Sequence, residues 1–253
     1  MYAKYVAIGD SQTEGVGDGD DRSGLRGWAD RLAEQLAPLD PGFRYANLAV
    51  RGKLIGEVRA EQLEPALALA PDLATVVAGL NDVLRSEYDG DAVAAQLEEM
   101  IGALTGAGAR VATVTYPDIG EIVPIARRWQ PRLTEFNARV REIAAKHGAV
   151  VVEADRHPVC ADRRIWSTDR LHLNPSGHAL LASGFADALG LPGSDDSWTH
   201  PLPPRPDPGL VRAVAGELRW AATFFAPWLW RRLTGRSSGD GRSAKRPTLE
   251  PLP

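Results

Sequence analysis

The sequence is poor in cysteine, in long apolar runs and in net charge, and each of these deficits excludes a class of protein. Its 253 residues include a single cysteine, Cys160, so an intrachain disulfide and a cysteine-based zinc site are both excluded. No apolar run approaches the roughly 18 to 20 residues of a membrane span. The formal net charge is only −4, which gives no reason to expect nucleic acid as the main partner.

The first ten residues hold an apolar run that is too short for a signal peptide and is typical of a first strand. We therefore expect a cytoplasmic protein. The composition that remains is that of an ordinary globular protein, with 44% hydrophobic and 25% charged residues. The chain is long enough for one substantial core with an appendage.

Short β-prone runs alternate with helical patterns as far as Leu191. Three of the runs are continuously apolar, as expected for strands buried on both faces of a parallel sheet. The alternation predicts a doubly wound α/β domain, with Asp91 as a helix N-cap and Gly148 as a helix stop. The predicted strands are residues 5–8, 43–48, 73–78, 109–115 and 149–153, and the predicted helices are residues 25–37, 55–70, 92–107, 131–147 and 175–189.

Composition divides the chain into three predicted parts. Residues 1–191 form the α/β domain, and residues 192–209 are rich in Pro, Gly, Asp and Ser, as linkers are. Residues 210–253 combine an aromatic-rich amphipathic helix over 210–233 with a basic tail that we expect to be disordered. From residue 210 onward, eight Lys and Arg stand against three Asp and Glu.

The aromatic-rich helix has three open roles: docking on the α/β domain, lining a pocket, or lying on an anionic membrane surface. Pro227 is expected to kink or end it. The candidate contacts to a membrane or a partner are Trp220, Phe224, Trp228, Trp230, Arg231 and Arg232.

Polar residues follow the predicted strands at the points where the strands end. Ligands of an open α/β sheet bind beyond the carboxyl ends of its strands, so these residues are expected to converge on one rim. They are Gly9-Asp10-Ser11, Arg51-Gly52, Gly79-Leu80-Asn81-Asp82 and Asp169-Arg170-Leu171-His172.

Ser11, Asp169 and His172 suit nucleophilic acyl transfer. A serine hydroxyl is a poor nucleophile until a histidine removes its proton, and that histidine needs a carboxylate to fix its tautomer. The spacing Asp-x-x-His places the two groups on one short turn. The backbone N–H groups of Ser11 and Gly52 and the side-chain amide of Asn81 are candidate donors to a developing oxyanion.

These blocks resemble the GDSL/SGNH hydrolase family, which is named for Ser, Gly, Asn and His in four separated blocks. All four occur in the family's order over about residues 3–190, and Gln12 stands where the name-giving Leu would be. The resemblance implies a three-layer α/β/α sandwich with a mainly parallel sheet of about five strands. It also implies hydrolysis of a small-molecule ester through an acyl-serine intermediate. The matching residues are Ser11, Gly52, Asn81 and His172, with Asp169 as the carboxylate.

Several residues near these motifs are expected to have structural roles. Asp10 and Asp82 are expected to hold loops by side-chain-to-backbone bonds. Arg51 could contact an acidic substrate, although a salt bridge is the simpler role. His178 follows His172 by six residues, but no third metal ligand accompanies them at a matching spacing, so neither a metal nor another cofactor is expected.

The leading hypothesis is therefore a carboxylic ester hydrolase acting on a small or medium acyl group. A thioesterase, a sugar deacetylase or a lysophospholipase would use the same residues. An acyltransferase would differ only in the alcohol that resolves the acyl-enzyme. Outside catalysis, a binding protein on a hydrolase fold and a membrane-recruited scaffold built around the aromatic-rich helix stay open.

Overall fold

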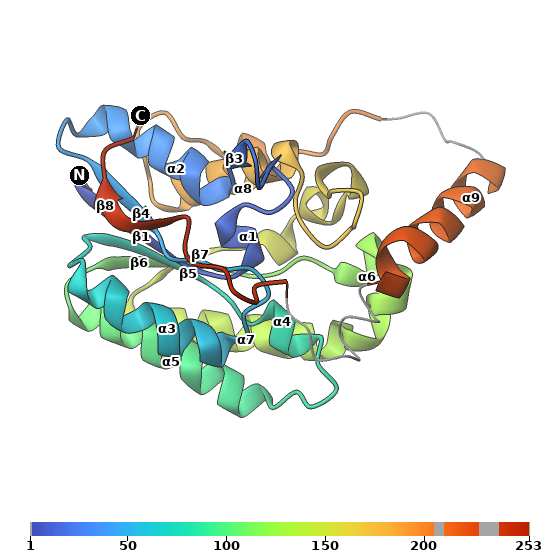
Figure 1. The fold of residues 1–253 in the computed structure, drawn as a ribbon, viewed down its shortest axis with the longest axis horizontal. Coiled ribbons are helices and arrows are strands. Elements are labelled where there is room, and N and C mark those ends of the chain that lie inside the picture. Colours follow the sequence, from blue (N-terminus) through green and yellow to red (C-terminus); the bar gives the residue numbers. More distant parts are fainter. Residues whose placement is uncertain (1, 205–209, 228–237, 253) are drawn as a thin grey trace.

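A six-stranded sheet lies between two layers of helices in the computed structural model, which describes residues 2–204, 210–227 and 238–252 (Figure 1). Five of these strands run parallel, and the sixth is an antiparallel edge strand. The three-layer α/β/α prediction is thus confirmed, with one strand more than expected. The sheet order is β7 (Val150–Val152), β6 (Arg110–Val114), β5 (Leu73–Val77), β1 (Lys4–Gly9), β4 (Arg44–Asn47) and β8 (Arg246–Glu250).

Five long helices cover the two faces of the sheet. The helices α2 (Trp28–Leu36) and α8 (Pro175–Ala188) lie on one face, and α3 (Ile55–Ala68), α5 (Gly90–Gly106) and α7 (Gln130–His147) lie on the other (Figure 1). The Trp28 and Phe185 rings stack at 4.3 Å and join α2 to α8. Helix α7 ends at Gly148 in the left-handed conformation as predicted, but the N-cap of α5 is Asp89 and not Asp91. The carboxylate of Asp89 accepts from the N–H groups of Asp91 and Ala92.

The centre of the sheet is the most deeply buried part of the molecule. The strands β1 and β5 are flanked by strands on both sides and by helices on both faces, which explains why they read as continuous apolar runs. The rings of Tyr5 and Tyr45 stack at 5.0 Å, and the Tyr5 hydroxyl bonds to Thr75 at 2.9 Å. The residues that follow β1 are therefore attached to a fixed support.

Shorter elements connect the layers. They are α1 (Ser11–Glu14), β2 (Gly19–Asp20), β3 (Gly24–Leu25), η1 (Ala37–Leu39), α4 (Leu80–Val83), α6 (Ile119–Ile122), η2 (Pro124–Trp129), η3 (Ala154–Arg156), η4 (Pro158–Ala161) and η5 (Arg163–Ile165).

The C-terminal part of the chain returns to the α/β domain. In the predicted linker, η6 (Asp196–Thr199) buries Trp198, and its indole N–H donates to Asp187 at 2.9 Å. The prediction of a wholly disordered tail is wrong, because residues 246–250 form β8 and pair with β4. Pro247 interrupts any strand pattern in the sequence, and proline is tolerated on an edge strand because one side of that strand makes no ladder bonds.

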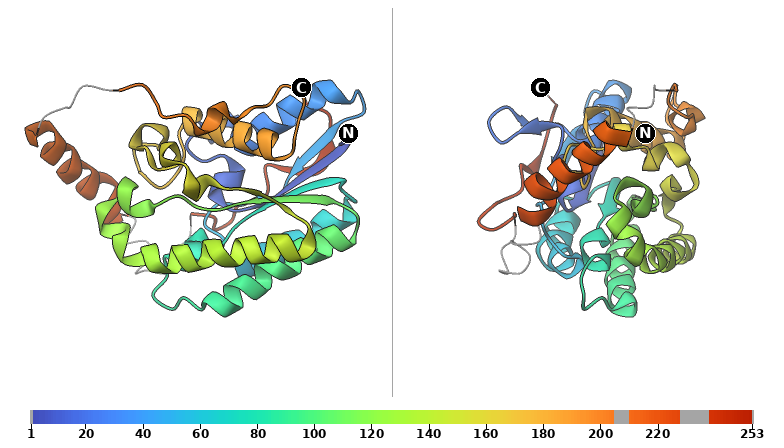
Figure 2. Two further views of the ribbon diagram at one scale, coloured as in Figure 1. Left: turned by 180° about the vertical axis from the view of Figure 1, so that it is seen from behind. Right: turned by 90° about the vertical axis from the view of Figure 1, so that its right-hand side faces the viewer.

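The predicted aromatic-rich helix is present as α9 (Leu210–Trp220), which continues into the π-helical turn η7 (Ala221–Phe225). It lies at one end of the sandwich, beside α6 (Figure 2). Four of the candidate membrane contacts, Trp228, Trp230, Arg231 and Arg232, lie outside the described residues. Within the three described ranges, no helix combines the length and apolar character needed to cross a bilayer.

Candidate active site

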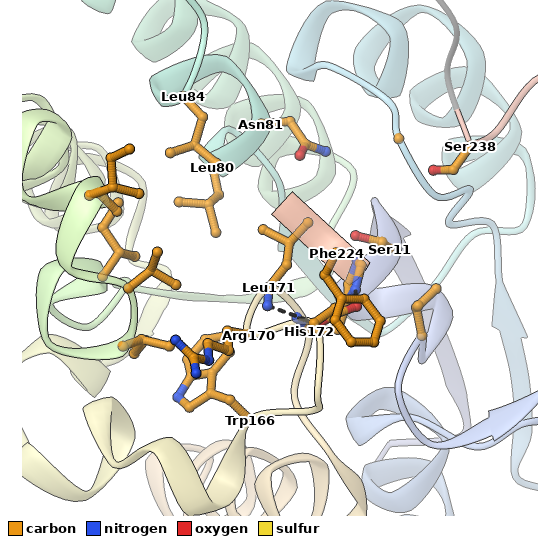
Figure 3. A pocket seen from close by; sticks show the side chains of 18 of the residues that line it. Ser11, Leu80, Asn81, Leu84, Trp166, Arg170, Leu171, His172, Phe224 and Ser238 are labelled. Atoms are coloured by element: carbon orange, nitrogen blue, oxygen red, sulfur yellow. Dashed lines mark hydrogen bonds and ion pairs between the residues drawn. The ribbon is translucent and has the colours of Figure 1, made fainter. Parts of the chain in front are cut away.

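The predicted residues line one cavity of about 550 Å³ at the carboxyl ends of the parallel strands. Ser11 follows β1, Gly52 follows β4, Asn81 follows β5, and Asp169 and His172 lie in the loop before α8. All five belong to the cavity wall, and Figure 3 shows Ser11, Asn81 and His172 from close by. Chain segments as far apart in sequence as Ser11 and His172 thus meet at this rim, as the pattern of strand ends predicted.

Ser11 is the first residue of α1 and is presented by a tight turn. The Asp10 side chain caps α1 by accepting from the Gln12 N–H at 3.2 Å. Gly9 before it has a φ of 154°, and a Cβ there would lie 2.3 Å from the Val77 carbonyl oxygen. Only glycine therefore lets β1 pass so close to β5 and turn at once into the helix. The Ser11 side chain is buried against the protein and open only toward the cavity.

Asp169 holds the His172 imidazole. Its Oδ2 lies 2.7 Å from His172 Nδ1, and its Oδ1 accepts from the N–H groups of Leu171 and His172 and from the Ser167 hydroxyl. Burial by itself would raise the pKa of Asp169, but the bonds from His172 and Ser167 outweigh it and hold that pKa well below its ordinary value. A carboxylate that stays ionised assigns the proton of the neutral ring to Nδ1 and leaves Nε2 as a base.

Asn81 has a fixed side chain. Its Nδ2 donates to the Lys53 carbonyl oxygen at 3.0 Å and, over a longer 3.3 Å, to Asp10 Oδ2. Gly79, which precedes it, has a φ of 107°, and a Cβ there would come within 2.5 Å of the Phe136 ring. Gly52 likewise has a positive φ, 78°, so the turn requires a glycine there whether or not its N–H meets a substrate.

Two carboxyls, buried Asp10 and half-buried Asp82, stand behind the cavity wall. Asp10 contacts the Gln12 N–H and the Asn81 amide, and Asp82 accepts from the Ile55 N–H at 2.9 Å at the start of α3. Burial raises the pKa of Asp10 to about 7 and that of Asp82 to about 6. Both side chains tie one loop of the site to another element.

Arg51 and His178 have protein partners. The Arg51 guanidinium bonds to Glu14 at 2.7 Å and to Asp21 at 2.9 Å, so it fixes the loop of Gly52 and is not directed at a substrate. His178 accepts from the Trp28 N–H through Nδ1 and donates to the Val16 carbonyl through Nε2. Burial lowers its pKa to about 4, and with both ring nitrogens engaged it has none left for a metal.

Gln12 is a site residue that sequence reasoning missed. Its side-chain Nε2 donates to the Leu171 carbonyl oxygen at 2.9 Å, and its Oε1 accepts from the Leu173 N–H at 3.3 Å. These two backbone groups flank His172. One buried amide therefore joins the turn that presents Ser11 to the turn that presents the histidine. The only signal in the sequence was a polar residue directly after Ser11, where the family has Leu.

Replacing Gln12 with methionine is expected to lower kcat about tenfold, the effect of losing two neutral hydrogen bonds of ordinary strength. Methionine keeps the length of the side chain but cannot bridge Leu171 and Leu173. The KM should stay within twofold, because the loss affects alignment of His172 with Ser11 and not the cavity wall. Steady-state kinetics on a short ester would measure both, and an unchanged kcat would show that the two turns are held by other contacts.

The rest of the cavity wall is largely apolar. It contains the aliphatic side chains of α4 and of the α6–η2 segment, together with the four aromatic residues Trp129, Trp166, Trp220 and Phe224. Figure 3 labels Leu80, Leu84, Trp166 and Phe224 among them. An arginine, Arg85, stands at the rim. The apolar wall residues include Leu80, Leu84, Ile119, Ile122, Val123, Ile125, Ala126, Trp129, Trp166, Leu171 and Phe224.

Comparison with known proteins places the chain in a family. The profile of the GDSL-like lipase/acylhydrolase family matches residues 7–180, so the chain belongs to this family of ester hydrolases. No curated protein matches. Among solved structures, the chain is similar to LAE5, an alpha/beta hydrolase enzyme from the metagenome of Lake Arreo, Spain. The TM-score is 0.62 and the identity 23%, over 74% of this chain and 95% of that one.

Two further similar structures are named as acetyl xylan esterases. Axe2 from Geobacillus stearothermophilus has a TM-score of 0.62 and 21% identity, over 79% of this chain and 97% of its own. The enzyme AlAXEase has a TM-score of 0.60 and 21% identity, over 74% of this chain and 99% of its own. At these identities the likeness establishes the shared fold. The family match ends at residue 180, so α9 and β8 lie beyond it.

Proposed function

We propose that this chain hydrolyses carboxylic esters through an acyl-serine intermediate, with Ser11 as nucleophile, His172 as general base and Asp169 as the carboxylate that orients it. The observation that carries the proposal is the 2.7 Å bond from His172 Nδ1 to Asp169 in a cavity that Ser11 also lines. In the first step, His172 Nε2 takes the Ser11 proton while Oγ attacks the ester carbonyl carbon. The alcohol then leaves with that proton, and water repeats the sequence to release the acid.

The tetrahedral intermediate carries a negative oxygen that needs donors. We assign the backbone N–H groups of Ser11 and Gly52 and the Asn81 amide to this role. Asn81 donates to Lys53 at 3.0 Å and, over a longer 3.3 Å, to Asp10, so the N–H on the Asp10 side is the one that we assign to the oxyanion. The bond to Lys53 keeps the amide oriented throughout.

Replacing Asn81 with alanine is expected to lower kcat by roughly 10² to 10³, the scale of losing one oxyanion donor. The KM should change much less, because this hydrogen bond forms mainly in the transition state. Asn81→Asp is the matched variant, since it keeps the shape, removes the donor and adds a charge that repels the oxyanion. Steady-state kinetics on one p-nitrophenyl ester would decide, and an unchanged kcat in Asn81→Ala would leave Asn81 a structural role.

The substrate class follows from the wall of the cavity. Besides the catalytic groups, the wall carries the polar residues Arg51, Arg85, Arg170, Thr223 and Ser238. Most of the remaining wall is aliphatic and aromatic surface, which suits an apolar acyl or alcohol group. A thioester would fit the same groups, and an acyltransferase would admit a second alcohol in place of water. The experiment that tests the function is a panel of p-nitrophenyl esters of increasing chain length, run with and without a serine-directed fluorophosphonate. Turnover that the reagent does not inhibit would contradict the serine mechanism.

A further inference from the structure

The end of α9 contacts the loop that carries the proposed catalytic pair. The Trp220 indole N–H donates to the backbone carbonyl oxygen of Asp169 at 3.0 Å. The Arg170 guanidinium lies over the Trp220 ring, 4.6 Å from its centre. An element outside the region matched by the family profile thus bonds directly to the backbone of the residue that orients His172.

A second contact lies one turn earlier on α9. Glu217 bridges two arginines of the catalytic loop and its approach, with 2.6 Å to Arg163 and 2.6 Å to Arg170. The bonds to Arg170 and Arg163 lower the pKa of Glu217, so it carries its charge at neutral pH. Charge-assisted bonds of this kind are stronger than neutral ones and set the orientation of both partners.

The loop itself has a reason to need such support. Arg170 has a φ of 59°, a left-handed conformation that side chains with a Cβ rarely adopt. Strained backbone of this kind persists where the surroundings hold it. Here the Arg170 guanidinium is held by its ion pair with Glu217 and by its stacking on the Trp220 ring. Arg170 lies between Asp169 and His172 in the chain. Its backbone conformation therefore sets how the Asp169 carboxylate faces the His172 imidazole.

The residues directly after Trp220 form part of the cavity wall. Thr223 and Phe224 of η7 and the following Pro227 line the same space as Ser11 and His172. Figure 3 shows the Phe224 ring on the side of the cavity where Ser11 and His172 lie. In contrast, Leu218 on α9 is 68% exposed and does not line the cavity.

We propose that the C-terminal helix is a positioning and specificity element of the ester hydrolase: Glu217 and Trp220 hold the Asp169–His172 turn, and Phe224 closes the apolar cavity. Neither Glu217 nor Trp220 is a catalytic residue, because each acts through the loop. The inference rests on the proposed function and adds a substrate preference to it. With Phe224 in place, esters with an apolar chain of several carbons gain contact area that an acetate cannot reach, about fourfold in kcat/KM per buried methylene.

The test uses four variants of the full chain: Glu217→Gln, Trp220→Phe, Phe224→Ala and, as the matched control on the solvent side of α9, Leu218→Ala. Glu217→Gln and Trp220→Phe are expected to lower kcat threefold to tenfold on both p-nitrophenyl acetate and octanoate, with KM within twofold. Phe224→Ala is expected to lower the octanoate-to-acetate ratio of kcat/KM about tenfold, because part of the chain loses its contact. Leu218→Ala should match the wild type in both respects.

A second readout separates positioning from general loss of stability. The proton between His172 and Asp169 should give a low-field resonance in the ¹H NMR spectrum of the wild type, and it should shift or broaden in Trp220→Phe at a temperature where circular dichroism shows a folded chain. The proposal is overturned if Glu217→Gln and Trp220→Phe keep the wild-type kcat and Phe224→Ala keeps the wild-type octanoate-to-acetate ratio of kcat/KM. The proposed function is tested separately: it fails if the wild type turns over no ester of the panel, and its serine mechanism fails if Ser11→Ala keeps the wild-type turnover.

Discussion

Ser11→Ala is expected to abolish ester turnover and fluorophosphonate labelling while the chain stays folded. The Ser11 oxygen forms the bond to the acyl group in the acyl-enzyme. Among the described residues of the cavity wall, no other side chain occupies this position at the start of α1. Loss of a nucleophile acting with its base costs about 10⁶ in kcat in enzymes of this mechanism, which would bring turnover near the detection limit. The alanine removes one oxygen from a side chain that packs at the end of β1, so the melting temperature should change little.

Ser238 provides the control for labelling. It lines the same cavity from the C-terminal segment and, among the residues that the structure describes, is the other serine on its wall. Ser238→Ala should still be labelled with one equivalent of fluorophosphonate, and mass spectrometry of the labelled peptide should place the reagent on Ser11. Labelling of the Ser11→Ala variant at the wild-type level would remove Ser11 from the nucleophile role.

The sheet and its rim could be predicted because their signals are local. The central strands are buried on both faces, so their apolar runs are continuous, and the polar residues at their ends lie at one rim by the geometry of parallel strands. The requirement for glycine at positions 9 and 79 is also local, because a Cβ at either position would collide with a neighbouring chain segment. Such requirements appear in the sequence as fixed residue types beside a strand.

The C-terminal contacts could not be predicted because their signals are distant. Strand β8 begins with Arg246 and Pro247, and it is a strand only because β4 offers an open edge. Trp220 has the spacing of any amphipathic helix, and its partner is a backbone oxygen 51 residues earlier. Gln12 likewise bonds to backbone groups about 160 residues away. A side chain that pairs with backbone leaves no complementary residue type to find.

Asp169→Asn is expected to lower kcat by about 10⁴ with little change in KM. In the wild type, Oδ2 accepts the Nδ1 proton of His172 while Oδ1 is engaged by the N–H groups of Leu171 and His172. Those two donors would keep the oxygen of the new amide on the Oδ1 side. Its NH₂ group would then face His172 Nδ1 and donate to it, which places the ring proton on Nε2.

That tautomer cannot take the proton of Ser11, so the base is lost although the geometry is kept. The substrate still meets the same cavity wall, which is why the loss should appear in kcat and not in KM.

Asp162→Asn is the matched control, because Asp162 is another loop carboxylate that pairs with Arg164 outside the cavity. Its kcat should stay within threefold of the wild type. Steady-state kinetics on p-nitrophenyl acetate would measure both variants. An Asp169→Asn variant with a near wild-type rate would mean that another carboxyl orients the imidazole, and buried Asp10 is a candidate because the charge of His172 acts on it.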